Sequence, residues 1–405
     1  MENEISTSLP PFTPDKSDRF HTQPVQTKQD AKDFIRINVE LNKQDSNYIR
    51  PLDKDIDFVF DKSKNKFFTH GDCVRWLLKD KSGKVVGRAA AFYNERTLDK
   101  TPKTGGMGFF ECIDDQEAAN VLFDQCRLWN QSQGLAAMDG PINFGERNNW
   151  WGLLVDGFTE PVYTMNYNPK YYQTLFENYG FKDYFKQYSY YMVVNDPRPE
   201  GYIKIWDKFK GKPDYSFKKV DKNNLEKGAE DFRKVYNGAW GGHEGFRDMT
   251  DDQAMKMMTK MKPVIIDYLM WFGYYKEEPI AFYINLPELN QLFKHVNGKL
   301  DLIGKLKFFY HSRIAKTNRK FFGIVFGVIP RFQRTGMEGA IAMAAHHGIA
   351  PTGRWDDFEL TWIGDFNPKM MAVADRLGAK IIKTHITYRL LFDPKAEFVR
   401  NKIIE

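Results

Sequence analysis

Apolar and polar positions follow regular periods along most of the chain. Residues 322–330 form an unbroken apolar run that ends in proline, which predicts a strand buried on both faces. A polar turn containing Gly336 and Gly339 follows it, and apolar positions three and four residues apart then predict a helix. Residues 358–363 predict a second strand, and residues 364–368 predict the start of another helix.

The first half of the chain repeats this order of elements. The tripeptide Asn-Pro-Lys at residues 168–170 and again at 367–369 opens a helix that leads into an aromatic-rich strand. Because these helix starts lie at matching places in the two halves, a tandem duplication is the simplest interpretation. The first copy is preceded by a predicted hairpin, strand, helix and strand, at residues 74–93, 107–113, 114–133 and 135–139.

The turn at residues 333–339 has the features of an anion site. A glycine turn at a helix start presents several backbone N–H groups that meet the positive end of the helix dipole. Gly336 and Gly339 let the backbone approach an anion closely, and Arg334 adds a positive charge. An ordinary strand-to-helix turn is the alternative, and the local pattern favours neither interpretation.

The matching position in the first half carries Asp114, Asp115 and Glu117, and it has no glycine. We expect Asp114 to cap the helix that follows. Three carboxylates would repel a pyrophosphate. The N-terminal copy is therefore expected to be degenerate for the cofactor and to serve as a support or as a wall of the acceptor site.

The segment Gln333-Arg334-Thr335-Gly336-Met337-Glu338 resembles the acyl-CoA pyrophosphate loop of the GNAT acyltransferases, usually Gln/Arg-x-x-Gly-x-Gly/Ala. The resemblance implies an α+β fold of two tandem GNAT-like domains, each with a mixed central sheet flanked by helices. It also places Gly327 where the family's preceding strand carries a bulge. The implied acyl-CoA-binding residues are Val328, Ile329, Gln333, Arg334, Thr335, Gly336, Met337, Gly339 and Asn367.

Most of the chain is similar to a bacterial family of tandem GNAT-like proteins, and residues 152–158, 168–172 and 358–362 carry this resemblance most specifically. Two positions depart from the GNAT pattern. Glu338 replaces a small residue and puts a negative charge at the phosphate site. Ala374 stands where the family often has a tyrosine acid, and a missing general acid costs about 10²–10⁴ in rate unless another group serves.

Acyl transfer from a thioester to an amine needs a base that takes the ammonium proton. The resemblance places the strand of Glu359 beside the donor notch, so Glu359 is the first candidate. Glu244 and His243, in a glycine-rich connector, come next. The alternatives are that Glu359 faces outward from its strand and that the connector is held by its packed aromatic residues.

Residues 140–158 form an irregular segment that is dense in Asn, Trp and Gly, and long loops of this kind are often functional. Packing of its two tryptophans at a domain interface is the alternative. The predicted substrate-binding residues come from this segment and from the connector: Asn143, Glu146, Arg147, Trp240 and Phe246.

The length of 405 residues fits two domains. A flexible arm at residues 1–26, an N-terminal domain at 27–200 and a C-terminal domain at 201–405 are predicted. The net charge of +6 permits an anionic ligand without requiring nucleic acid.

Three cysteines and eight histidines show no metal or redox spacing, which predicts reduced thiols, no metal site and a cytoplasmic protein. The N-terminus lacks signal-peptide character, and no apolar run is long enough to span a membrane. Acyl chain length, acceptor and oligomeric state do not follow from the sequence.

The leading hypothesis is an acyl-CoA-dependent N-acyltransferase that acts on a small-molecule or peptide amine. One alternative is a Fem-like aminoacyl-tRNA-dependent transferase, for which the basic, aromatic segment at residues 299–320 would be the RNA-binding face. A solvated helix face is the simpler interpretation of that segment, with CoA contact second. The other alternative is a catalytically inactive ligand-binding protein, which Glu338 and Ala374 favour.

Overall fold

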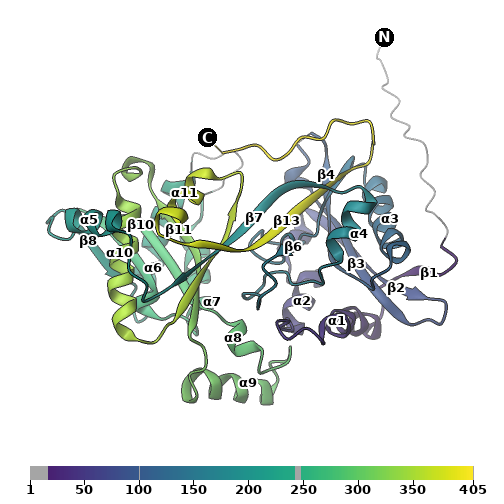
Figure 1. The fold of residues 1–405 in the computed structure, drawn as a ribbon, viewed down its shortest axis with the longest axis horizontal. Coiled ribbons are helices and arrows are strands. Elements are labelled where there is room, and N and C mark those ends of the chain that lie inside the picture. Colours follow the sequence, from purple (N-terminus) through teal and green to yellow (C-terminus); the bar gives the residue numbers. More distant parts are fainter. Residues whose placement is uncertain (1–16, 100, 242–247, 405) are drawn as a thin grey trace, which may run out of the picture. The chain divides into compact units, whose positions relative to one another are not determined.

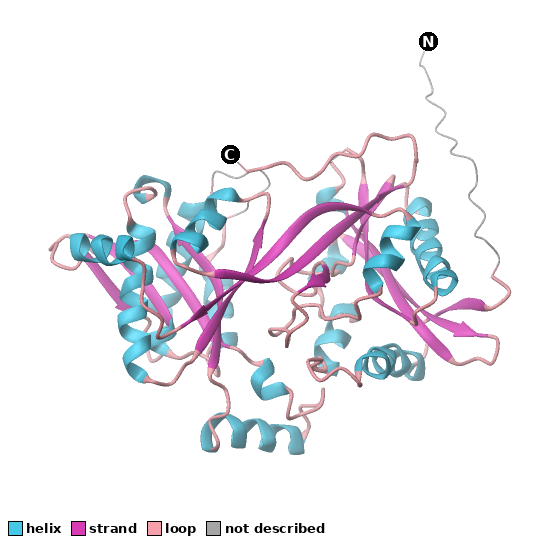
Figure 2. Cartoon of the chain, in the orientation of Figure 1, coloured by secondary structure: helices cyan, strands magenta, loops and turns pink. Residues whose placement is uncertain are grey.

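The computed structural model describes residues 17–99, 101–241 and 248–404 (Figure 1). Contacts divide the chain into two compact units, and helices flank the strands of both (Figure 2). Unit 1 consists of Met1–Lys186 and His385–Asn401, and unit 2 consists of Gln187–Thr384 and Lys402–Glu405.

The cut predicted at residue 200 leaves both domains continuous, whereas the two compact units are discontinuous. The reason is that strands β7 (Lys182–Val193) and β13 (Lys380–Leu391) each run from one unit into the other. The C-terminal part of β13 pairs with β5 (Ala137–Gly140) of unit 1. Sequence adjacency therefore does not decide which unit the last strand completes.

Unit 1 orders its strands β1-β2-β3-β4-β5-β13. The hairpin and the strand-helix-strand order predicted for this half are confirmed, but β1 lies inside the predicted flexible arm. Its further elements are β1 (Phe20–Pro24), α1 (Lys28–Asn42), α2 (Asp53–Phe60), β2 (Gly71–Asp80), β3 (Val85–Asn94), β4 (Thr104–Cys112), α3 (Gln116–Ser132), β6 (Leu153–Asp156) and α4 (Tyr172–Tyr179).

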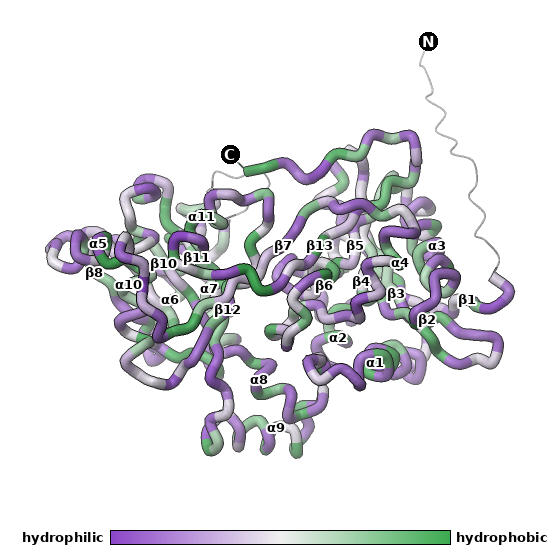
Figure 3. The backbone as a smooth tube through the Cα atoms, in the orientation of Figure 1, coloured by the Kyte–Doolittle hydropathy of each residue, from purple (hydrophilic) through white to green (hydrophobic). Residues whose placement is uncertain are grey.

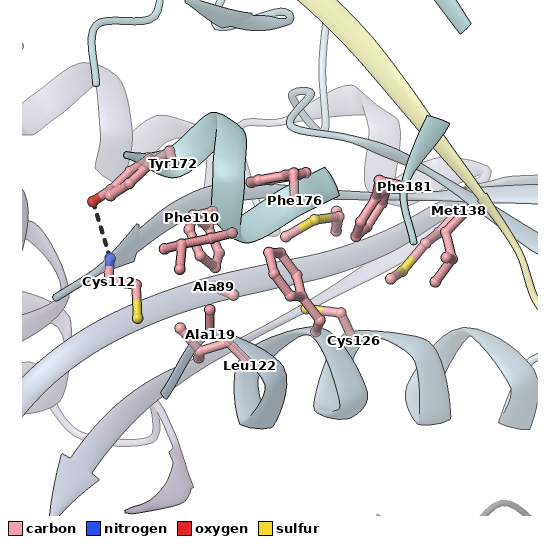
Figure 4. Packing of buried hydrophobic residues seen from close by; sticks show 14 of the residues in the cluster. Ala89, Phe110, Cys112, Ala119, Leu122, Cys126, Met138, Tyr172, Phe176 and Phe181 are labelled. Atoms are coloured by element: carbon pink, nitrogen blue, oxygen red, sulfur yellow. Dashed lines mark hydrogen bonds between the residues drawn. The ribbon is translucent and has the colours of Figure 1, made fainter. Parts of the chain in front are cut away.

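Aromatic rings fill the core of unit 1 between β4 and the helices α3 and α4 (Figure 4). Phe110 stacks on Phe123 at 4.8 Å, and Phe176 meets both rings edge-on. The Cys112 backbone N–H donates to the Tyr172 hydroxyl at 2.9 Å, which ties the end of β4 to α4. Large rings at facing positions therefore fix how these two helices pack on the sheet.

Unit 2 orders its strands β7-β12-β11-β10-β9-β8. Helices α10 and α11 pack on one face of this sheet, and α6 and α7 pack on the other. Its further elements are α5 (Glu200–Phe209), β8 (Tyr215–Lys219), α6 (Leu225–Trp240), α7 (Asp251–Met261), β9 (Met270–Tyr275), β10 (Glu278–Pro287), α8 (Asn290–Phe293), α9 (Leu302–Phe309), β11 (Lys320–Val328), α10 (Met337–Ile349), β12 (Asp357–Gly364) and α11 (Pro368–Arg376).

Helix α5 and strand β8 of unit 2 have no counterpart among the predictions from the sequence. The signal for α5 was present, because Tyr202, Ile205, Trp206 and Phe209 recur at helical spacing. Tyr202 and Phe209 are buried. Helix α5 packs on α10, so it bears directly on the candidate site.

Candidate functional site

Strands β11 and β12 separate partway along their length. They pair in parallel from Lys320 and Asp357 only as far as Gly323 and Leu360, although β11 continues to Val328. Beyond the last pair, the backbone of β11 on this edge has no ladder partner in β12. We call this separation of the two strands the notch, and β11 continues from it toward the start of α10.

Irregular pairing accompanies this separation. The register of β11 against β10 skips Ile324, so the bulge lies at Ile324 and the prediction of a bulge at Gly327 is wrong. Gly327 has a different role, because a Cβ there would lie 2.9 Å from the Trp240 ring. The register of β12 against β7 also shifts between Leu360 and Ile363. Such shifts bend strands and re-aim their edges.

The turn before α10 leaves the helix start uncapped. Gly336 is the N-cap residue, has a φ of 96°, and makes no side-chain cap. The first N–H groups of a helix have no intrahelical acceptor, and Gly336 offers those of α10 no side-chain acceptor. Gln333 Nε2 donates to the Val328 carbonyl at 2.9 Å, and the Thr335 hydroxyl donates to the Phe332 carbonyl at 2.7 Å. These two bonds hold the turn against the end of β11.

Two features of this turn limit its fit to a phosphate. The Arg334 backbone N–H donates to Glu338 Oε1 at 3.3 Å, so a carboxylate of the chain already uses one donor. A Cβ on Gly339 would lie 3.1 Å from both Ile205 and Tyr202 of α5. Gly339 therefore allows α5 and α10 to pack closely, and this packing accounts for the glycine without a bound anion.

Asn367 and Ala374, the two residues singled out at helix α11, make contacts that stabilise the fold. Asn367 caps α11, because its side chain accepts from the Met370 N–H at 3.2 Å. Ala374 is 1% exposed and packs in the core on this face. A contact between Asn367 and a cofactor stays a prediction.

Glu359 lies at the centre of a buried charge cluster. Its Oε1 accepts from Lys320 Nζ at 3.0 Å and its Oε2 from Lys383 Nζ at 2.8 Å. Glu359 is 0% exposed and Lys383 3%, so the alternative of an outward-facing side chain is wrong. Burial opposes the charged form of Lys320, but Glu359 and Asp357 outweigh it and raise the pKa of Lys320. Ammonium groups thus occupy both oxygens of the candidate base.

Tyr190 of β7 is a candidate that the sequence did not single out. It pairs with Leu360, where the notch begins, and it is fully buried. Among the described residues, its hydroxyl has no hydrogen-bond partner. Burial, with Asp375 and Tyr188 nearby, raises its pKa to about 12, so the hydroxyl keeps its proton. Strand pairing brings it there, and no local sequence signal marks it.

Trp240 is the last residue of α6 and stacks on Phe282 of β10. Its ring lies over Gly327 of β11, on the sheet face covered by α6 and α7. The predicted site residues His243, Glu244 and Phe246 lie outside the described residues, and their roles stay predictions.

The other predicted substrate-binding residues belong to unit 1, whereas Trp240 belongs to unit 2. Asn143 is 4% exposed, and its Oδ1 has no hydrogen-bond partner among the described residues. Glu146 is exposed, and the Arg147 guanidinium lies 5.4 Å from the Trp151 ring centre. Of these three, Asn143 alone is buried with an unpaired polar atom.

Unit 1 contains the same strand separation, but its own chain fills it. Strands β4 and β5 pair in parallel only up to Gly106 and Asp139. Beyond that point the Ile142 N–H donates to the Met107 carbonyl at 2.8 Å. A Cβ on Gly108 would lie 1.8 Å from the Ile142 carbonyl oxygen, so the backbone is in direct contact with β4.

Side chains of the protein itself also occupy the start of α3. Asp115, not the predicted Asp114, caps the helix by accepting from the Ala118 N–H at 3.1 Å. Arg19 binds Asp115 at 2.6 Å and Glu117 at 2.8 Å. Two of the three carboxylates expected to repel a pyrophosphate are instead held by an arginine of the chain.

Residues 17–99, 101–241 and 248–404 contain no cluster of three His, Cys, Asp or Glu side chains able to hold a metal ion. In the same described part of the chain, no helix has the length and apolar character needed to cross a bilayer.

The chain is similar to two curated proteins over most of its length. It is 26% identical over 373 residues to a bacterial ceramide synthase of Caulobacter vibrioides, covering 90% of this chain and 96% of that protein. It is 25% identical over 367 residues to Protein YghO of Escherichia coli, covering 89% and 93%. No protein-family model matches the chain.

Solved structures show the fold. A tandem GNAT protein from the clavulanic acid biosynthesis pathway aligns with a TM-score of 0.54 and 7% identity, covering 93% of this chain and all of that one. A GCN5-related glucosamine N-acetyltransferase region of a fungal multidomain β-N-acetylglucosaminidase also gives 0.54, with 12% identity, covering 92% of this chain and 38% of that protein. With its two separated strand pairs, each followed by a helix, this chain has a tandem GNAT fold.

Proposed function

We propose that the protein is an acyl-CoA-dependent N-acyltransferase whose donor site lies in unit 2. The observation that carries this proposal is the separation of β11 and β12 after Gly323 and Leu360, next to the uncapped start of α10. An open strand edge can hydrogen-bond an extended amide-containing chain such as pantetheine. An uncapped helix start can receive a pyrophosphate.

In this proposal the residues have distinct roles. The backbone near Val328 and Ile329 binds the pantetheine arm on the side away from β10, and the turn from Gln333 to Met337 binds the pyrophosphate. The Ile329 N–H already donates to the Ile280 carbonyl at 3.0 Å, and the Val328 carbonyl accepts from Gln333, so these groups contribute less than an unpaired edge would. Arg334 adds positive charge at an exposed position. Asn367 extends the same site from the start of α11.

The reaction forms an N–C bond between the amine and the acyl carbon and breaks the C–S bond. The amine loses a proton to a base, and the departing thiolate gains one. We propose Tyr190 as the acid, because its hydroxyl is buried, protonated and without a hydrogen-bond partner among the described residues. Glu359 stays the candidate base from the sequence, although its two ammonium partners favour a role in the charge cluster. Glu244 and His243 are the other candidates.

In this proposal the acceptor is an amine, and the name of one relative bears on its class. A ceramide is the amide of a fatty acid with a long-chain amino alcohol, so the name of the Caulobacter relative fits N-acyl transfer. We propose a long-chain amine as the acceptor and a fatty acyl-CoA as the donor. Binding of acyl-CoA without turnover of any such amine would support the inactive-protein alternative.

Calorimetric titration with acetyl-CoA, myristoyl-CoA and free CoA tests the donor site. Gly336→Asp places a carboxylate at the helix start and should weaken binding at least about tenfold. Gly353→Asp is the matched control, because Gly353 also has positive φ and lies beyond the other end of α10, with open space around it. Equal affinities in the two variants would contradict the proposal.

Glu338→Gln tests the same turn in the opposite direction. It removes a negative charge from the first turn of α10 and weakens the acceptor that holds the Arg334 N–H. Acyl-CoA should then bind about two- to fivefold more tightly. A weaker complex would indicate that Glu338 organises the loop instead of opposing the phosphate.

Tyr190→Phe separates the chemistry from the fold. Removing a buried hydroxyl that lacks a partner should leave the melting temperature unchanged or slightly higher. If Tyr190 protonates the leaving thiolate, kcat should fall about 100-fold while acyl-CoA affinity is kept. A variant with full activity would exclude Tyr190 as the acid.

A further inference from the structure

Helix α9 and the π-helical turn that continues it (Tyr310–Ile314) expose a set of large apolar side chains. These side chains recur at helical spacing and therefore share one side of the helix. Their exposed fractions are Leu302 75%, Ile303 66%, Leu306 61%, Phe309 57%, Tyr310 50% and Ile314 63%. Burial of apolar surface is the main driving force of folding, so an exposed stripe of this size calls for a partner.

The opposite side of this helix is anchored to unit 2. Phe308 stacks on Phe293 of α8 at 5.6 Å, and His311 stacks on His295 at 3.6 Å. Gly304 is buried, and a Cβ there would lie 2.0 Å from the Lys299 carbonyl oxygen. The apolar stripe thus faces outward because the other face is fixed by packing.

Basic side chains border the stripe. Lys305 falls along one edge of a helical projection, and Lys307 falls along the other. Residues 302–320 contain no Asp or Glu. Figure 3 shows apolar and polar positions alternating along the α9 tube. This segment is basic and apolar at once, whereas a solvated helix face would expose mainly polar groups.

We propose that α9 and the following turn form an interfacial helix that docks unit 2 on an anionic lipid bilayer. An amphipathic helix with a basic border lies in the plane of the membrane, its apolar side chains among the acyl chains and its lysines near the phosphates. The segment is about 20 Å long, shorter than the roughly 30 Å hydrocarbon core, so it lies on the bilayer without crossing it. The inference does not depend on the proposed acyl transfer.

A protein partner fits these observations less well. Protein interfaces are depleted in lysine, whereas Lys305 and Lys307 border this stripe on its two sides. A lysine or arginine beside an apolar side chain can extend to the phosphate level of a bilayer while its neighbour stays buried. Negative lipid headgroups therefore complement the basic border, and acyl chains complement the stripe.

Vesicle flotation of the full chain tests the inference. The probes are vesicles of phosphatidylcholine alone and vesicles that also contain phosphatidylglycerol, at low and high salt. The wild-type chain should float with the anionic vesicles. Leu306→Ser/Phe309→Ser should reduce this binding at least about tenfold. Ile203→Ser is the matched control, since Ile203 is a 44% exposed residue of α5, and it should leave binding unchanged.

Charge variants sharpen the test. Lys305→Gln/Lys307→Gln should weaken binding to the anionic vesicles about fivefold per side chain and should reduce its salt dependence. Circular dichroism melting should show that all variants fold, because every changed side chain is exposed. Failure of the wild-type chain to bind anionic vesicles would overturn the inference, as would unchanged binding by Leu306→Ser/Phe309→Ser. A concentration-dependent dimer lost in that variant would assign the stripe to a second copy instead.

Discussion

In each unit a helix starts after a strand that separates from its parallel neighbour. A side chain caps that helix start in unit 1 but not in unit 2. In unit 1, Asp115 caps α3 and Arg19 neutralises the nearby carboxylates. In unit 2, Gly336 leaves α10 without a side-chain cap. The same backbone arrangement is therefore closed by the chain in one unit and open in the other.

The strand separations differ in the same way. In unit 1 the segment after β5 hydrogen-bonds to β4 and leaves no room for a Cβ on Gly108. In unit 2 the chain after β12 turns directly into α11, and Asn367 caps that helix. Asn168, the sequence counterpart of Asn367, instead hydrogen-bonds to the backbone N–H and carbonyl of Leu154. A repeated motif thus serves two structural purposes.

The largest expected effect concerns the buried charges. Glu359→Ala leaves Lys383 buried with its carboxylate partner removed, and it should lower the free energy of unfolding by about 3–5 kcal/mol. In unit 1, Glu111→Ala should have a comparable effect, because Glu111 pairs with the buried Arg88 at 3.3 Å. Urea unfolding followed by tryptophan fluorescence measures both changes.

The double variant Glu359→Leu/Lys383→Met is the control for this prediction. An apolar pair of similar volume should recover most of the lost stability, since the desolvation cost disappears with both charges. Full stability of Glu359→Ala together with a loss of acyl transfer would instead favour Glu359 as the base.

Adding a methyl group at Gly108 of unit 1 or at Gly327 of unit 2 should destabilise the two units by different amounts. Gly108→Ala meets a backbone carbonyl, which cannot rotate away, so it should destabilise the protein by about 3 kcal/mol. Gly327→Ala meets the Trp240 ring, which can tilt, so about 1 kcal/mol is expected. Thermal unfolding of the two variants checks the difference, and equal losses would mean that the unit 1 segment is displaced easily.

Mild acid should destabilise unit 2 through His346, which lines a cavity of about 30 Å³ beside Met192 and Phe358. Burial, with Arg198 and His347 nearby, lowers its pKa from 6.5 to about 4. The unfolded chain therefore takes up this proton at a higher pH than the folded chain does. The stability contribution is complete above pH 6.5 and is lost as the pH falls toward 4.

The resulting slope is at most about 1.4 kcal/mol per pH unit. Urea unfolding at several pH values measures it, and the His346→Gln variant should show a smaller slope in that window. An unchanged slope would assign the acid sensitivity to other groups.

The smallest expected effect is at the capped helix start of unit 1. Asp115→Ala removes the cap of α3 and should cost about 1 kcal/mol. Arg19→Ala breaks two exposed ion pairs and should cost less than about 1 kcal/mol. Chemical denaturation resolves the order of the two losses, and a larger effect of Arg19→Ala would show that neutralisation matters more than capping.

Local patterns predicted many elements well. The predicted helix start at residues 364–368 matches α11, which begins at Pro368 after the Asn367 cap. The hairpin of β2 and β3 and the strand β11 were also anticipated. These features depend on neighbouring residues, so hydrophobic periodicity and capping chemistry were sufficient.

Features that depend on distant residues were not anticipated. The bulge lies at Ile324 because β10 sets the register of β11. Glu359 is buried because Lys320 and Lys383, from two other strands, hold it. Neither relation leaves a signal in the local sequence, since each arises only when the strands pair.

The amino-acid sequence by itself determined the tandem order of elements, the glycine turn at residues 333–339 and the basic character of residues 299–320. The tertiary structure decided that the helix start of α10 is open, that the helix start of α3 is closed, and that α9 turns its apolar side chains outward. The reason is physical. Propensity, capping and charge act between neighbours in the chain, whereas burial and strand register exist only after distant segments pack.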